Sequence, residues 1–89
     1  MTEIRSCIDA IDHELVKLIG QRVRYVEAAS AFKNDAAGVR AEERQRKMLV
    51  ERREWAAREG VDPELIDELF RNMVRRFIEL EMQRFEERR

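Results

Sequence analysis

The feature that most constrains how this chain folds is an apolar pattern through its first third. Apolar side chains recur there every three or four residues, which is typical of one face of an amphipathic helix. The recurring residues are Ile4, Ile8, Ile11, Leu15, Leu18, Ile19, Val26 and Ala29. A helix over residues 2–33 would be about 46 Å long, whereas a compact chain of 89 residues has a radius of gyration of only about 12 Å. The rest of one chain cannot cover so long a stripe, so the pattern predicts that a second copy buries part of it in an intertwined homodimer.

Helix-breaking residues divide the remainder of the chain. Residues 34–38 are small and polar, and Gly60 to Pro63 combine a glycine suited to a helix end with an N-cap aspartate, Asp62, and a first-turn proline. No segment has the alternating pattern of a strand. We predict one all-α domain over 1–89, with helices at about 2–33, 40–59 and 63–87 and a loop at 34–39.

Gly20 leaves an alternative open for the first helix. A glycine in a helix interior costs about 1 kcal/mol relative to alanine, so it can mark a break. A broken helix would permit a compact monomer or a helix-turn-helix in place of the long helix.

Composition excludes several classes of function. The net charge is −1, whereas a general nucleic-acid-binding domain normally carries a clear basic excess. The single cysteine, Cys7, and the single histidine, His13, cannot form a Cys/His metal cluster, and we expect no metal or cofactor. The chain has no glycine-rich phosphate loop, no apolar signal segment and no membrane-spanning run, so we expect a cytoplasmic protein.

Cations occupy the apolar face of the first helix. At 100° per residue the stripe is centred near about 50°, and Arg22 and Lys33 fall at about 40° and 60°. Arg5, at about 140°, lies on the edge of the stripe. Arg22 could pack its stem and pair with an acid, and Lys33 could be solvated at the helix end, where a cation is favourable. Alternatively, the two cations line an anion pocket.

The other two predicted helices repeat this feature. Arg44 shares a face with Met48 and Trp55, and Glu51 on the same face is its candidate ion-pair partner. Glu81 lies between apolar residues of the third helix. The simplest interpretation of its position is that it forms a salt bridge with one of the arginines. Taken together, the cations predict a pocket for a small dianion, since arginine forks clamp carboxylates. Such a pocket would act on its ligand by positioning and electrostatics.

Four segments carry a resemblance to a known family. They are Ile4-Arg5-x-x-Ile8-Asp9-x-Ile11-Asp12, Arg22-x-x-Tyr25-Val26-x-Ala28-Ala29-Ser30-x-Phe32-Lys33, Glu43-Arg44-x-x-x-Met48-Leu49-x-Glu51-Arg52 with Trp55-Ala56, and Leu69-Phe70 leading to Phe77-Ile78-x-x-Glu81. With these segments the chain resembles the all-helical chorismate mutases. Within that family it is similar to the bacterial isochorismate pyruvate lyases of salicylate and siderophore synthesis, because of the second and third segments.

The resemblance implies an intertwined dimer with two cofactor-free active sites. Arg22 and Arg44 match the family's carboxylate-binding arginines, and Arg5 would reach the site from the other copy. Lys33 matches the lysine that hydrogen-bonds the substrate's ether oxygen, at the start of a loop that closes over the substrate. The wall around the substrate ring would be formed by Val26, Met48, Phe77 and Ile78.

Glu81 departs from the pattern of the lyases, which carry glutamine at this position. A carboxylate would repel the negative charge that develops on the ether oxygen, so Glu81 must hold a proton and donate a hydrogen bond. Two reactions of a chorismate-type dianion fit the same pocket. The favoured one splits isochorismate into salicylate and pyruvate, and the alternative rearranges chorismate to prephenate. A non-catalytic helical interaction or nucleic-acid-binding module is the alternative of another class.

Overall fold

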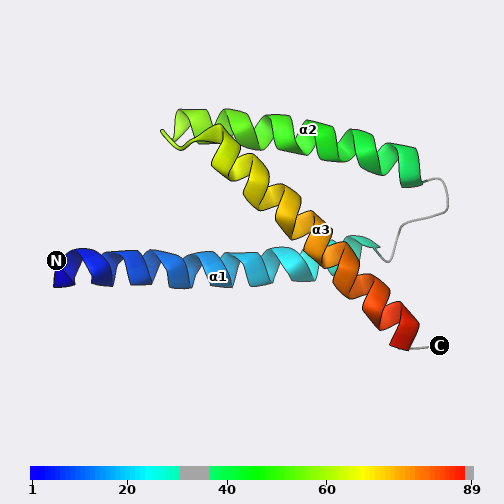
Figure 1. Cartoon of the computed structure of the whole chain (residues 1–89), viewed down its shortest axis with the longest axis horizontal. Helices are drawn as coiled ribbons and strands as arrows, with labels where there is room; N and C mark the ends of the chain where they lie inside the picture. Colours follow the sequence, from blue (N-terminus) through cyan, green and yellow to red (C-terminus); the bar gives the residue numbers. More distant parts are fainter. Residues whose placement is uncertain (31–36, 88–89) are drawn as a thin grey trace. The chain divides into compact units, whose positions relative to one another are not determined.

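The computed structural model describes residues 1–30 and 37–87, and it contains three helices (Figure 1). They are α1 (Thr2–Ser30), α2 (Ala37–Arg58) and α3 (Pro63–Glu87). Within the described ranges every secondary-structure element is an α-helix, so the prediction of an all-α fold is confirmed. None of these helices is both long and apolar enough to cross a membrane.

The first helix is continuous through Gly20. It runs unbroken for 29 residues, from Thr2 to Ser30, so the alternative of a break at this glycine is wrong. The neighbouring residues are good helix formers whose hydrogen bonds offset the cost of one glycine. The predicted end of this helix, near residue 33, lies outside the described residues.

Most of the apolar stripe of α1 is exposed in the single chain. Ile4 is 58% exposed, Ile11 61% and Leu15 48%, whereas Ile19 and Val26 nearer the end of the helix are half-buried. Burial of such side chains drives folding and association. The exposed apolar surface of α1 is therefore typical of a surface that packs against another chain.

The turn between α2 and α3 is built as its residues predict. Gly60 has a φ of 73°, which glycine adopts without strain. The amide of Val61 donates to the carbonyl of Ala56 (2.8 Å) and that of Gly60 to Ala57 (3.2 Å), the pair of bonds that closes a helix C-terminus. Asp62 Oδ1 accepts from the amide of Glu64 (3.0 Å), so both predicted caps are confirmed.

The start of α2 differs from the prediction. The helix begins at Ala37, not near residue 40, so Gly38 lies in its first turn and not in a loop. The amides of a first turn have no partner within the helix, so a glycine there disturbs few helical bonds. Its cost of about 1 kcal/mol is offset by the long helix-forming segment that follows.

The α2–α3 hairpin has a small core. Among the described residues the buried apolar side chains are Leu49 and Ala56, both on the side of α2 that faces α3, and the buried charged side chain is Asp67 of α3. The two helices meet at the turn and diverge away from it (Figure 1). The fully buried apolar core is thus small, and half-buried apolar side chains and the polar contacts described below add to it.

Candidate active site

The two predicted binding arginines of α1, Arg5 and Arg22, lie far apart along that helix. Arg22 and Val26 are one turn apart on the same face, and both are half-buried. Arg5 is exposed near the start of the same helix. The step from residue 5 to residue 22 corresponds to about 26 Å along the axis. The two arginines of one chain therefore cannot hold the same small ligand.

On α2, Arg44 and Met48 form a second pair one turn apart. Met48 is half-buried, and Arg44 is exposed with no ion pair among the described side chains. Glu51, its candidate partner from the sequence, instead pairs with Arg52, whose Nη1 lies 2.6 Å from Glu51 Oε1. The guanidinium of Arg44 is thus available to an anion from outside the hairpin.

On α3, Phe77 and Glu81 form a third pair, and both side chains are half-buried. Ile78 points about 100° away from Phe77 and is 45% exposed. In the described part of the chain Glu81 makes no ion pair with an arginine, so the salt bridge suggested by the sequence is not formed. The predicted site residue Lys33 lies outside the described residues.

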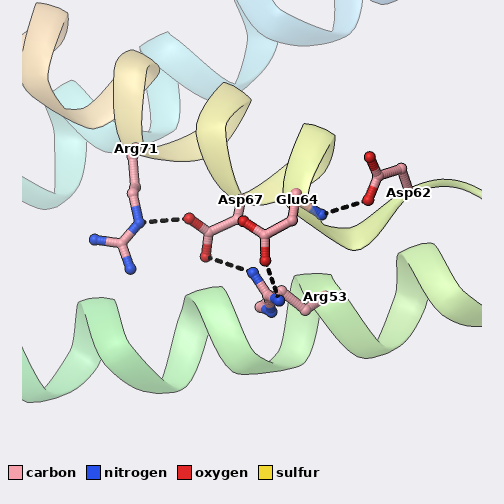
Figure 2. A network of polar contacts seen from close by, with 5 residues as sticks. All are labelled: Arg53, Asp62, Glu64, Asp67 and Arg71. Carbon is pink, nitrogen blue, oxygen red and sulfur yellow. Dashed lines mark hydrogen bonds and ion pairs between the residues drawn. The ribbon is translucent and has the colours of Figure 1, made fainter.

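The structure also contains a polar cluster that the helix patterns did not predict (Figure 2). Arg53 of α2 donates from Nη2 to Glu64 Oε1 (2.5 Å), and its Nη1 lies 3.4 Å from Asp67 Oδ2. Arg71 Nε donates to Asp67 Oδ1 (2.5 Å), one turn along α3. The hydrogen bond from Arg71 lowers the pKa of Asp67, and Arg53 lowers it further. The hydrogen bond to Glu64 raises the pKa of Arg53.

A second unpredicted feature is the position of Arg52 between two aromatic rings. Its Cζ lies 4.5 Å from the centre of the Trp55 ring and 5.6 Å from that of Phe70 on α3. Its Nε is buried without a hydrogen-bond acceptor, so the rings are its main neighbours. The contacts of Arg53 and Arg52 with α3 could not be predicted from the sequence, because they depend on how α2 and α3 pack together. Sequence spacing could have shown the Asp67–Arg71 pair, at i and i+4.

Two of the predicted binding arginines each lie one helical turn from an apolar side chain. Arg22 lies beside Val26 and Arg44 beside Met48, so each guanidinium has an apolar neighbour that can pack on the ring of a ligand. Among the described residues no three His, Cys, Asp or Glu side chains are grouped to hold a metal ion. The chemistry that these groups can perform is orientation of a small anion and stabilisation of charge on it.

Comparisons with known proteins agree with this description. Residues 4–82 match the sequence model of the family chorismate mutase type II. The chain is 40% identical over 78 residues to the isochorismate pyruvate lyase of Pseudomonas aeruginosa, an alignment that covers 88% of this chain and 77% of that protein. It is 32% identical over 76 residues to the T-protein of Haemophilus influenzae, covering 84% of this chain but 20% of that protein.

Proposed function

The chain belongs to the chorismate mutase type II family, and we propose that it is a cofactor-free enzyme that splits isochorismate into salicylate and pyruvate. The observation that carries this choice is the 40% identity to an isochorismate pyruvate lyase, which extends over 88% of this chain. In the reaction the carbon–oxygen bond to the enolpyruvyl group breaks while a hydrogen passes from the ring to that group's methylene carbon. No covalent intermediate with the protein is needed.

Two arginines bind the substrate's carboxylates in this proposal. Arg22 and Arg44 present forked guanidinium groups that can each hold a carboxylate through two hydrogen bonds. Val26, Met48, Phe77 and Ile78 enclose the ring and the side chain. Enclosure in a compact conformer supplies most of the rate acceleration, because the reacting atoms are then held close together.

Lys33 and Glu81 stabilise the breaking bond. The ether oxygen gains negative charge as its bond to the ring breaks, and a lysine ammonium nearby stabilises that charge. A protonated Glu81 donates a second hydrogen bond to the same oxygen. Both interactions strengthen as the charge develops, so they favour the transition state over the bound substrate.

The proposed enzyme works as a homodimer, with each site completed by Arg5 of the other copy. Arg5 and Arg22 of one chain are about 26 Å apart along α1, far more than a six-membered ring with two carboxylates spans. Arg5 can meet a substrate held by Arg22 only if the two come from different copies. The exposed stripe of α1, with Ile4 at 58% and Ile11 at 61%, is the surface that the second copy covers.

The second candidate is a chorismate mutase, which the family match over residues 4–82 favours. The rearrangement of chorismate to prephenate needs the same two carboxylate contacts and the same charge at the ether oxygen. The position of the ring hydroxyl decides which reaction is available to a bound substrate. We place the protein in the cytoplasm and in a pathway to salicylate and siderophores, in line with its single cysteine, Cys7, and the proposed product.

The test is to incubate the purified protein with isochorismate and with chorismate separately and to measure salicylate, pyruvate and prephenate. We expect equal amounts of salicylate and pyruvate from isochorismate, and little or no prephenate from chorismate. Arg44→Gln should abolish this activity, whereas Arg76→Gln, which removes an exposed arginine that pairs with Glu79 on α3, should leave it unchanged. Prephenate as the main product would favour the mutase. Absence of every product at saturating substrate would contradict both candidates and leave a non-catalytic module, which binds nucleic acid with a steep salt dependence.

A further inference from the structure

In the part of the chain that the structure describes, the ion pairs that join α2 to α3 all involve one arginine. Among the described side chains, Arg53 is the residue of α2 that pairs with acids of α3, through Glu64 at 2.5 Å and Asp67 at 3.4 Å (Figure 2). Asp67 is 7% exposed, and each of its oxygens faces a guanidinium, Oδ1 that of Arg71 and Oδ2 that of Arg53. Arg71 lies on the same helix as Asp67, so it is the contact with Arg53 that requires one particular alignment of the two helices.

The apolar contacts of the hairpin do not demand that alignment. The buried apolar side chains of the described hairpin are Leu49 and Ala56, and apolar contact, unlike an ion pair, is non-directional. The carboxylate of Asp67 is less tolerant, because a slip of α3 would take its Oδ2 away from Arg53 and leave the buried charge with Arg71, on its own helix, alone. The contact of the Asp67 carboxylate with Arg53 is thus the buried polar contact that specifies the alignment of α3 on α2 among the described residues.

The cluster lies away from the proposed binding residues of both helices. Arg53 follows Arg44 by nine residues, which places it about 13 Å along α2 and on the opposite face of that helix. On α3, Asp67 precedes Phe77 by ten residues, or about 15 Å. No member of the cluster can therefore touch a substrate that Arg44 holds, and any effect on the reaction must pass through the positions of the helices.

We propose that Asp67 is a positioning residue, which through Arg53 sets the alignment of α3 on α2 and thereby fixes where Phe77 and Glu81 of α3 lie relative to α2, the helix that carries Arg44 and Met48. The inference rests on the proposed function for its catalytic consequence. A slip of one residue moves a helix by about 1.5 Å and turns its side chains by about 100°. Displacements of about 1 Å can reduce a reaction rate roughly 100-fold when catalysis depends on orientation.

Trp55 reports on the alignment without any substrate. It is the single tryptophan of the chain, and it stacks with Arg52, which also contacts the Phe70 ring of α3. A shift of α3 changes the surroundings of this stack, and so the emission of Trp55. The position of the helices can therefore be measured even if the protein acts on neither of the proposed substrates.

The experiment compares Asp67→Asn with Glu79→Gln, which removes an exposed carboxylate whose ion pair with Arg76 stays within α3. The amide introduced by Asp67→Asn would turn a donor toward Arg53 or Arg71, both of which are also donors. At a temperature where both variants are fully folded by circular dichroism, Asp67→Asn should shift the Trp55 emission and lower kcat about tenfold or more with a smaller change in KM. Glu79→Gln should change none of these.

A second variant covers the case in which Asp67→Asn does not fold. Arg53→Lys keeps the positive charge but loses the second donor group that reaches Glu64 and Asp67 together, and it should give the same emission shift and loss of kcat. A lower melting temperature with unchanged Trp55 emission and unchanged kcat, in whichever variant folds, would overturn the proposal. If the wild type produces neither salicylate nor prephenate, the proposed function fails, and the Trp55 emission alone decides whether Asp67 sets the alignment.

Discussion

The guanidinium of Arg52 stacks on the ring of Trp55, with Cζ 4.5 Å from the ring centre, and the side chain keeps a buried Nε without a hydrogen-bond acceptor. The attraction between the cation and the ring offsets the cost of that unsatisfied donor. Arg52 also contacts the Phe70 ring, so the stack joins α2 to α3. Arg52 thus links the two helices through aromatic rings, as Arg53 links them through ion pairs.

Substitution of Arg52 by methionine tests the stack. Arg52→Met keeps much of the length of the side chain but removes the charge, and we expect it to lower the free energy of unfolding by about 1 kcal/mol. Urea unfolding followed by circular dichroism measures this change. Arg76→Met is the control, since its ion pair with Glu79 is exposed and should contribute less than about 0.5 kcal/mol. Equal stability of the two variants would show that the cation on the rings contributes nothing.

Acid should weaken the hairpin through Asp67. The hydrogen bond from Arg71, with help from Arg53, lowers the pKa of Asp67 in the folded protein below its ordinary value of about 3.9. The charged form is therefore favoured by folding, and its contribution is fully present above that ordinary value and lost as the pH falls through the lowered pKa. Urea midpoints of wild type and Asp67→Asn should differ at neutral pH and converge as the pH falls through the lowered pKa of Asp67. A difference that persists unchanged at low pH would contradict this linkage.

Gly20→Ala should stabilise the first helix. The new Cβ would lie 3.7 Å from Arg24 Nη1, which is an ordinary contact, and alanine is favoured over glycine in a helix interior by about 1 kcal/mol. A higher melting temperature, read by circular dichroism at a fixed protein concentration, is the expected result. A lower one would mean that another helix packs closely on Gly20 in the assembled protein.

The helix ends were predictable because their chemistry is local. Gly60 needs a positive φ and Asp62 caps the next helix, and both properties follow from a few adjacent residues. The start of α2 was placed too late because Gly38 was interpreted as part of a loop, although a first turn tolerates glycine. The helical periodicity also predicted which face of α1 is apolar and that the helix continues through Gly20, which the structure confirms.

The contacts between helices were less predictable. Glu51 was the expected ion-pair partner of Arg44, because both point to the same face of the helix. In the structure Glu51 instead pairs with the neighbouring Arg52. The pairing of Arg53 with Asp67 depends on how α2 crosses α3, which no spacing within one helix reveals. The apolar faces of the helices indicate which cations are candidate ligands, and that stays a prediction, whereas ion-pair partners on another helix could not be predicted from the sequence.

Glu81→Gln should keep the activity or raise it. Glu81 is half-buried beside Phe77, and the proposed role is to donate a hydrogen bond to the ether oxygen. The amide of glutamine has nearly the same size and always carries donor hydrogens. The measurement is kcat for salicylate formation at saturating isochorismate. A large loss of kcat in the variant would remove hydrogen-bond donation from the role of Glu81.

Mixing two inactive variants should restore activity if Arg5 acts across the dimer. We expect Arg5→Gln and Arg44→Gln each to lose about 100-fold in kcat/KM, because a charged contact to a carboxylate contributes up to about 3 kcal/mol. In a mixed dimer one site would combine the intact Arg44 of one copy with the intact Arg5 of the other, and the second site would lack both. Random exchange makes about half of the dimers mixed, so activity should recover to roughly a quarter of that of the wild type.

The recovery depends on exchange of subunits, which a short exposure to mild denaturant followed by refolding ensures. Arg44→Gln mixed with Arg22→Gln is the matched control. These two residues would belong to the same copy's share of a site, so every site in the mixed dimer would lack one of them and activity should stay low. Recovery in this control equal to that of the first mixture would contradict the assignment of Arg5 to the partner's site. No recovery in either mixture would mean that Arg5 serves its own chain or no site at all. Recovery in the first mixture alone is the result that a separation of about 26 Å between Arg5 and Arg22 on one rigid helix requires.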